Sequence, residues 1–231
     1  MTVAHAMRRW GRLLGTTFVC VLSLSTVGSA DMYTGTMTSG SGLTGFGGWS
    51  AGASLTWTVD DTTTPGLWHY EYELTVANKD ISHLIVETSL TFVDEPTVTN
   101  LFNLSWGGGH DVDTFGGSGD PGISYGDIYG LKIDNVSTKD LLVTFDSDRV
   151  PVWGDFYAKD GTDNLGGGVK EDVYLYNDGF FAIDPIAPLA NGPLNGHLLV
   201  PDTVSVAPVP GAVLLGALGL CTSGYILRRI V

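Results

Sequence analysis

Cysteine is almost absent from this 231-residue chain, which has only Cys20 and Cys221, one in each of the two apolar segments near its ends. The long stretch from Asp31 to Asp202 contains none. Thiol catalysis, cysteine-based zinc sites and disulfides are therefore excluded in that stretch. A domain of this size buries enough apolar surface to fold without disulfides. The residues before Cys20, Thr17-Phe18-Val19, also lack the small side chains of a lipoprotein signal.

Basic residues are also scarce. Of the 11 lysines and arginines, five lie near the two ends of the chain, at Arg8, Arg9, Arg12, Arg228 and Arg229. The stretch from Asp31 to Asp202 therefore holds six basic residues and all 25 acidic ones, a balance of −19 against −14 for the whole chain. Phosphate binding needs clustered cations, so this balance excludes nucleic acid as a partner. It suits solubility, cation binding or a neutral sugar ligand.

Known catalytic motifs are missing as well. The chain has no HExxH, GxSxG, phosphate-loop or GxGxxG pattern, and its histidines are scattered without metal-ligand spacing. We therefore expect a non-enzymatic protein. Glu71 and Glu73 would lie about 7 Å apart on one strand face, and paired carboxylates at such a distance can serve glycoside hydrolysis. A solvated strand face is the favoured interpretation of this pair, which makes a secreted glycoside hydrolase the least favoured function.

Between residues 31 and 202 no segment has helical periodicity, and the apolar residues alternate instead. In Trp68–Val76, every second residue from Trp68 is apolar and the others are polar. Leu55–Val59, Leu84–Phe92, Leu141–Phe145, Trp153–Lys159 and Val173–Tyr176 follow the same period. A period of two is typical of strands with one buried and one wet face. Turn sequences rich in Gly, Pro, Asn and Asp separate these runs.

These short, half-polar strands predict an all-β fold, an antiparallel β-sandwich of the jelly-roll type, for residues 31–200. Residues 201–210 hold three prolines and are expected to form a stiff spacer.

The N-terminal 30 residues are typical of a secretory signal peptide. A basic start is followed by the mostly apolar stretch Leu13–Val27 and by small residues at Val27-Gly28-Ser29-Ala30. Small residues at the third and first positions before Asp31 predict cleavage between Ala30 and Asp31. The apolar stretch is short for a membrane span, which favours cleavage over anchoring.

The C-terminal end predicts a membrane anchor. Residues 203–227 carry no charge, and a helix can begin after Pro210 because proline is tolerated at a helix start. A helix over 211–227 is about 25 Å long, and snorkelling by the basic residues of the terminal segment 228–231 would let it cross a ~30 Å hydrocarbon layer. Positive charge stays in the cytoplasm, which places the acidic domain outside. The cleaved signal peptide requires the same orientation. A buried apolar C-terminal helix is the alternative.

The order of features in this tail resembles the PEP-CTERM sorting signal. The likeness covers residues 206–231: a Pro-x-Pro motif, an apolar and glycine-rich helix, and a final basic pair. The motif residues are Pro208, Val209, Pro210, Arg228 and Arg229. Val209 replaces the glutamate that is usual in the family. Val152–Lys159 and His197–Pro201 also resemble stretches of other proteins with this signal.

The resemblance implies that the protein is a substrate of an exosortase-type processing enzyme, in bacteria that make extracellular polysaccharide. It implies export to the membrane, and surface or matrix release if the tail is processed. A sortase signal is the alternative, because Val200-Pro201-Asp202-Thr203-Val204 is similar to Leu-Pro-x-Thr-Gly. Val200 and Val204 replace two of its residues, which disfavours that alternative.

Two features of the middle stretch suggest ligand binding. The glycine-rich segment 107–120 carries Asp111, Asp113 and Asp120, whose carboxylates could surround Ca²⁺. Trp106, directly before this segment, and His110, within it, are candidate ligand contacts. Trp49 and Trp153 also fall near loops or strand ends, where aromatic faces can stack on sugars. A solvated loop and core tryptophans are the competing interpretations.

We therefore expect an exported surface or matrix protein of structural or interaction type. A carbohydrate- or calcium-binding module is the alternative, and no cofactor other than calcium is expected.

Overall fold

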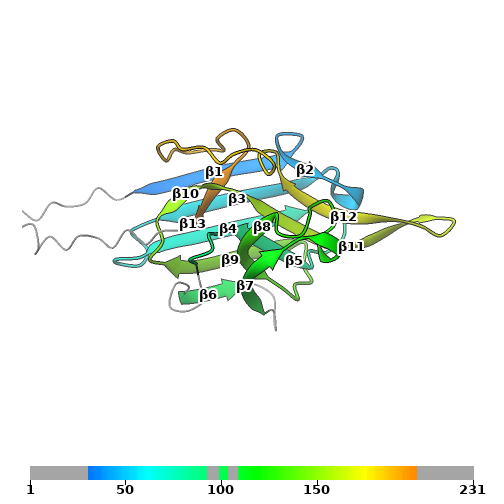
Figure 1. Ribbon diagram of the computed structural model, residues 1–231, viewed down its shortest axis with the longest axis horizontal. Helices are drawn as coiled ribbons and strands as arrows, with labels where there is room; N and C mark the ends of the chain where they lie inside the picture. The colour runs from blue at the N-terminus through cyan, green and yellow to red at the C-terminus, as the bar shows by residue number, and fades with distance from the viewer. Residues whose placement is uncertain (1–30, 93–98, 104–108, 202–231) are drawn as a thin grey trace, which may run out of the picture.

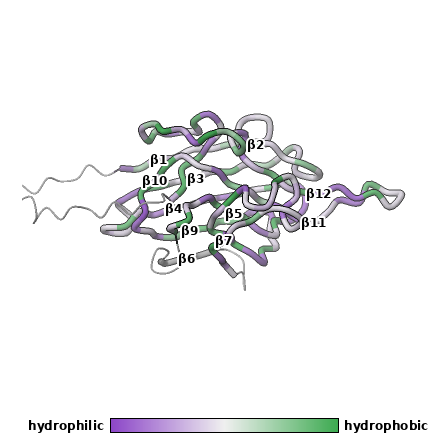
Figure 2. Tube along the Cα trace, viewed as in Figure 1, coloured by the Kyte–Doolittle hydropathy of each residue, from purple (hydrophilic) through white to green (hydrophobic). Residues whose placement is uncertain are grey.

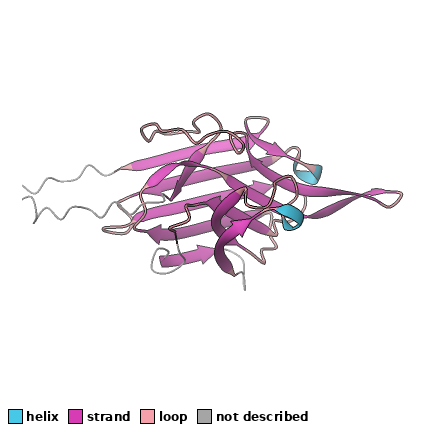
Figure 3. Cartoon of the chain, viewed as in Figure 1, coloured by secondary structure: helices cyan, strands magenta, loops and turns pink. Residues whose placement is uncertain are grey.

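The computed structural model describes residues 31–92, 99–103 and 109–201. It is an all-β structure with two short 3-10 helices, Gly47–Trp49 and Gly117–Gly119 (Figures 1 and 3). The strands are β1 Met32–Ser39, β2 Gly42–Gly45, β3 Ala53–Asp60, β4 Trp68–Val76, β5 His83–Glu87, β6 Thr99–Asn103, β7 His110–Phe115, β8 Ile128–Ile133, β9 Asp140–Ser147, β10 Pro151–Gly154, β11 Phe156–Gly166, β12 Val169–Asn177 and β13 Leu198–Pro201. The prediction of an all-β fold is confirmed.

Eleven strands form one sheet in the order β6-β9-β4-β3-β1-β2-β12-β11-β5-β8-β7, and β10 and β13 form a separate pair. Every neighbouring pair is antiparallel except β1 and β2. The prediction of a wholly antiparallel sheet is wrong at that point. Gly40 and Gly42 have φ of 82° and 93°, values that glycine tolerates. They turn the chain so that β2 lies parallel to the end of β1 and then pairs with β12.

The large sheet curls around the main core (Figure 1). β13 packs against both β3 and β5, which are far apart in the strand order, so the sheet must fold over to bring them to one strand. Tyr72 on β4 donates a hydrogen bond from its hydroxyl to the Leu199 carbonyl oxygen at 2.9 Å. The β10–β13 pair therefore lies against the inner face of the large sheet.

Strand alternation places the core as expected along β3, β4 and β9. Tyr70, Tyr72 and Leu74 are fully buried, whereas Glu73 between them is exposed. Figure 2 shows the hydropathy changing from residue to residue along the strands. Burying one face of each strand provides the main stabilising free energy, at about 25 cal/mol per Å² of apolar surface.

The predicted alternation over Leu84–Phe92 fails after Glu87. Strand β5 ends there, and Leu90 is 77% exposed. Leu84, Ile85 and Val86 are all buried, because one face of β5 contacts the main core and Ile85 joins a second apolar cluster on the other face.

A long arm of the β11–β12 hairpin projects from the body of the protein (Figure 1), and its flanks are hydrophilic (Figure 2). None of the helices in the described ranges is long and apolar enough to cross a membrane. The predicted signal peptide, the end of the spacer, and the predicted anchor helix over 211–227 with the basic terminus lie outside the described residues.

Candidate functional site

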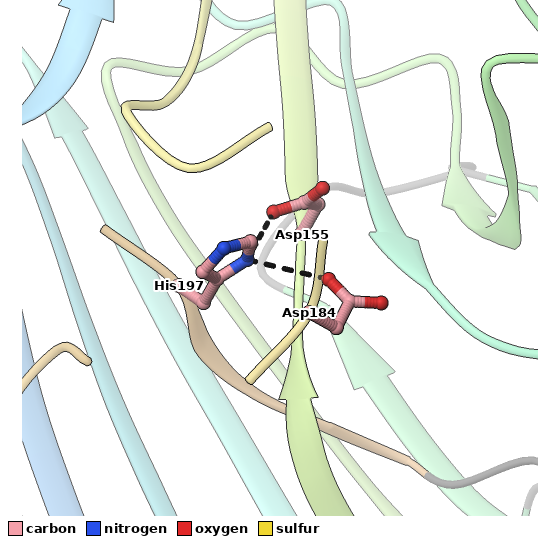
Figure 4. Close-up of side chains that lie close together, drawn as sticks. All are labelled: Asp155, Asp184 and His197. Atoms are coloured by element: carbon pink, nitrogen blue, oxygen red, sulfur yellow. Dashed lines mark hydrogen bonds and ion pairs between the residues drawn. The ribbon is translucent and has the colours of Figure 1, made fainter. Parts of the chain in front are cut away.

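Asp155, Asp184 and His197 meet where the two sheets join, and we call them the Asp–His centre (Figure 4). Asp155 lies between β10 and β11, where the chain passes from the small sheet to the large one. His197 directly precedes β13, and Asp184 lies on the segment that connects β12 to β13. Gly154 permits this crossing, because a Cβ atom there would lie 2.5 Å from the Val200 side chain.

The imidazole of His197 holds the centre together. Its Nδ1 lies 2.9 Å from Asp155 Oδ1 and 3.3 Å from Asp184 Oδ1. The His197 and Asp155 side chains are 0% and 9% exposed, whereas that of Asp184 is 45% exposed. The centre is therefore buried on one side and open to solvent at Asp184.

Asn177, at the end of β12, holds the Asp155 carboxylate in place through a hydrogen bond. Its Nδ2 donates to Asp155 Oδ1 at 2.6 Å and to the Gly196 carbonyl oxygen at 2.8 Å. Its Oδ1 accepts a hydrogen bond from the Phe156 backbone N–H at 2.9 Å. Asn177 is fully buried, so these bonds satisfy an amide that would otherwise be costly to bury.

A third carboxyl group, Glu87, stands beside the centre. Its Oε2 accepts a hydrogen bond from the Asp155 backbone N–H at 2.8 Å. Burial, together with the charges of Asp184 and Asp155, raises the pKa of Glu87 to about 8. Burial also raises the pKa of Asp155 and of Asp184, although the Asn177 and His197 contacts partly offset this for Asp155. Three carboxyl groups thus converge near one imidazole.

A groove of about 430 Å³ opens beside Asp184. It is lined by Pro151–Trp153 on one side and by Asp184–Leu189 on the other. A smaller cavity of about 40 Å³ adjoins it, with Glu87, Thr88, Trp153 and Asp184 among its lining residues. Trp153 Nε1 and Thr88 Oγ1 are buried and have no hydrogen-bond partner within the described part of the chain. A mostly apolar groove with a few polar groups at its base has the character of a small-molecule site.

The residues that the sequence suggested for calcium do not form a metal-sized group in the described structure. Asp111 and Asp113 are exposed on β7. Asp120 is buried and lies 2.9 Å, at Oδ1, from His83 Nε2. The contact with His83 lowers the pKa of Asp120 despite the opposing effect of burial. Asp120 therefore has an interaction partner inside the protein.

The other predicted ligand residues divide between described and undescribed parts of the chain. His110 is exposed at the start of β7, and Trp106 lies outside the described residues. Trp49 is a core residue whose indole N–H donates to the Asn78 carbonyl oxygen at 2.9 Å. Trp153 lines the groove but is only 3% exposed and belongs to the main core, as the core interpretation of the tryptophans expected.

The carboxylate pair that suggested hydrolysis stands apart from the groove. Glu71 and Glu73 lie on the face of β4 that points away from the buried Tyr70, Tyr72 and Leu74. Neither residue lines the groove beside Trp153.

Of the predicted processing residues, only Asp31 is described. Its backbone N–H donates to Asp61 Oδ1 at 2.9 Å. Ala30 and the sorting residues Pro208, Val209, Pro210, Arg228 and Arg229 lie outside the described part of the chain.

Motif spacing could not have revealed the Asp–His centre, because its residues are single side chains far apart in the sequence. One signal was present. The two stretches for which the sequence predicts a resemblance to other proteins, Val152–Lys159 and His197–Pro201, contain Asp155 and His197. The structure pairs them through β10 and β13, with Trp153 opposite Leu199.

Comparisons with known proteins leave the site to be interpreted from its geometry. No protein-family model matches the chain, and neither a curated protein nor a solved structure is similar to it. The resemblance of the tail to the PEP-CTERM signal therefore stays a prediction.

Proposed function

We propose that this is an exported, non-enzymatic surface or matrix protein whose β domain binds a neutral saccharide in the groove beside Trp153. The groove itself, an apolar hollow with an exposed carboxylate at its edge, carries this proposal. Saccharides offer apolar ring faces and many hydroxyl groups. The apolar side chains of the groove and the exposed Asp184 carboxylate suit both.

The charge of the domain favours a neutral ligand. With 25 acidic and six basic residues between Asp31 and Asp202, the domain repels anionic polymers. The hydroxyl groups of a neutral saccharide can donate hydrogen bonds to Asp184 without bringing a second negative charge close to it. Trp153 Nε1 and Thr88 Oγ1, in residues that line the adjoining cavity, are buried and have no partner within the described residues.

The arrangement of carboxyl groups favours binding over hydrolysis. Glycoside hydrolysis needs two carboxyl groups on either side of the scissile bond. Here Glu87 and Asp155 are tied to each other through the Asp155 backbone, and the Asp155 carboxylate accepts a hydrogen bond from Asn177. Only Asp184 of the three is substantially exposed.

The export half of the proposal rests on the sequence of the two ends. A signal peptide cleaved after Ala30, an anchor helix over 211–227 and a PEP-CTERM-like tail would deliver the domain to the cell surface. An exosortase-type enzyme is the proposed processing partner, and extracellular polysaccharide is the proposed ligand source. We also propose that the curled sheet and the β10–β13 pair together form a jelly-roll-like sandwich, since β13 contacts both β3 and β5.

Saccharide binding is tested with the full-length protein in detergent on an array of neutral oligosaccharides, followed by calorimetry with the best glycan. We expect Trp153→Phe and Asp184→Asn to weaken binding about tenfold each, since each removes a contact of roughly 1 kcal/mol or more. Asp172→Asn, on the exposed part of β12, is the matched control and should bind normally. Absence of retention on every neutral glycan, or equal affinity in all variants, would refute the proposal.

A further inference from the structure

The Asp–His centre has the composition of a metal site. Among the described residues, Asp155, Asp184 and His197 each offer one ligand atom, and these atoms all lie within 4.8 Å of one another. We infer that the three residues bind one divalent metal ion of the Zn²⁺ class, which fastens the Asp184 segment to the β10–β13 sheet. This inference does not depend on saccharide binding.

The distances suit such an ion. Zn²⁺ binds imidazole nitrogen and carboxylate oxygen at about 2.0–2.1 Å, so neighbouring ligand atoms of a tetrahedral site stand about 3.3 Å apart. His197 Nδ1 lies 3.3 Å from Asp184 Oδ1 and 2.9 Å from Asp155 Oδ1. Small side-chain movements would therefore complete three corners of the tetrahedron.

The charge of the centre also calls for a cation. Asp155 and Asp184 converge beside Glu87, and no lysine or arginine of the described chain forms an ion pair with any of the three. Burying carboxylates close together without a cation is unfavourable. A divalent ion would relieve this repulsion.

The donor set indicates the class of metal. Ca²⁺ and Mg²⁺ are bound almost entirely by oxygen, whereas one imidazole with two carboxylates suits Zn²⁺ and neighbouring transition metals. The exposed side of Asp184 gives an entry path and leaves room for water as a fourth ligand. The adjoining 40 Å³ cavity has space for about one water, and Trp153 and Thr88, which line it, have unpaired donors.

The competing explanation is that hydrogen bonds, without a metal ion, hold the three side chains of the Asp–His centre together. In that case the Nδ1–H of His197 donates to Asp155, which also accepts from Asn177. His197 Nε2 is buried and has no partner within the described residues, and it packs against Gly179, so it cannot reach the carboxylates. The two explanations differ in what added metal does.

The test uses the full-length protein stripped with EDTA and titrated with Zn²⁺ by calorimetry and thermal melting. We expect saturable one-to-one binding that weakens at acid pH, because the ligands must lose protons. At about a hundredfold excess over Kd, the melting temperature should rise by roughly 5–10 °C. Asp184→Asn should weaken Zn²⁺ binding at least about tenfold, since it removes a ligand at a half-exposed position that the fold tolerates.

The matched control is the double variant Asp111→Asn with Asp113→Asn, which changes two exposed carboxylates on β7. It should bind Zn²⁺ as the parent does. Equal binding by the parent and Asp184→Asn overturns the inference, as does loss of binding in the β7 variant alone. Stabilisation by Ca²⁺ without stabilisation by Zn²⁺ would overturn the assigned class of metal.

Discussion

At the residue scale, single buried polar residues determine which interactions form inside this protein. Asp120, expected as a calcium ligand, instead contacts His83 from the loop before β8, and both side chains are buried. Glu87, which no pattern singled out, accepts a hydrogen bond from the Asp155 backbone N–H, and burial raises its pKa to about 8. Burial disfavours a charged carboxyl group. The His83 contact outweighs this effect and lowers the pKa of Asp120, whereas burial prevails at Glu87 despite its hydrogen bond.

The Glu87 pKa makes stability depend on pH. The folded protein holds a proton on Glu87 between pH 4.5 and about 8 that the unfolded chain has released. The stability that this proton provides is therefore fully present below pH 4.5 and is lost as pH rises to about 8. Over that range the free energy of unfolding falls by at most about 1.4 kcal/mol per pH unit. We expect Glu87→Gln to match the parent near pH 4.5 and to be more stable by about 2–4 kcal/mol at pH 9.

Urea denaturation in EDTA across this pH range measures the difference. Glutamine keeps an oxygen acceptor for the Asp155 N–H, so the fold is preserved. Glu73→Gln, an exposed neighbour of the core on β4, serves as the control and should follow the parent curve. Parallel curves for the parent and Glu87→Gln would show that Glu87 ionises normally.

At the element scale, the decisive feature is the break between β10 and β11. The alternating run Trp153–Lys159 predicts one strand, but the chain changes sheets at Asp155. β10 pairs with β13, whereas β11 pairs with β5 and β12, so the two halves of the alternating run belong to different sheets. Asn177 bridges the break by bonding to Phe156, Asp155 and Gly196.

Removing this bridge should weaken the junction of the sheets. We expect Asn177→Ala to destabilise the protein by about 2–4 kcal/mol, because it leaves the buried Phe156 N–H without its acceptor and removes a donor from the Asp155 carboxylate. The Gly196 carbonyl loses one of its two donors and keeps the Gly179 N–H at 3.2 Å. Denaturant unfolding measures this loss. The control Asn164→Ala, on the exposed arm of β11, should change stability by less than about 0.5 kcal/mol. A similar small effect at Asn177 would mean that water replaces the amide.

At the scale of the whole molecule, an acidic β domain lies between two end segments that the sequence predicts to be a signal peptide and a sorting tail. The domain begins with Asp31, whose backbone nitrogen lies 2.9 Å from Asp61 Oδ1. If the signal peptide is removed after Ala30, the new α-amino group would stand next to this carboxylate. The charged α-amino group of Asp31 would then form an ion pair with the Asp61 carboxylate.

Intact mass and fractionation from native cells test the predicted processing. We expect a mature chain that starts at Asp31 and ends near Pro210, in the matrix or cell-surface fraction. Replacing Arg228 and Arg229 by alanine should leave the tail uncut, because the basic end is part of the resemblance to the sorting signal. A parent protein with an intact C-terminus in the membrane fraction would instead mean a simple anchored protein.

The sequence by itself determined the all-β fold and the core faces of β3, β4 and β9, because those depend on a local period of two that water and burial impose on every strand. Only the tertiary structure decided the parallel β1–β2 pair, the break at Asp155 and the meeting of Asp155, Asp184 and His197. The order of the strands and the curling of the sheet depend on contacts between segments that are distant in the sequence, and such contacts produce no periodic pattern in it. The three residues of the Asp–His centre become neighbours because β13 returns to pair with β10.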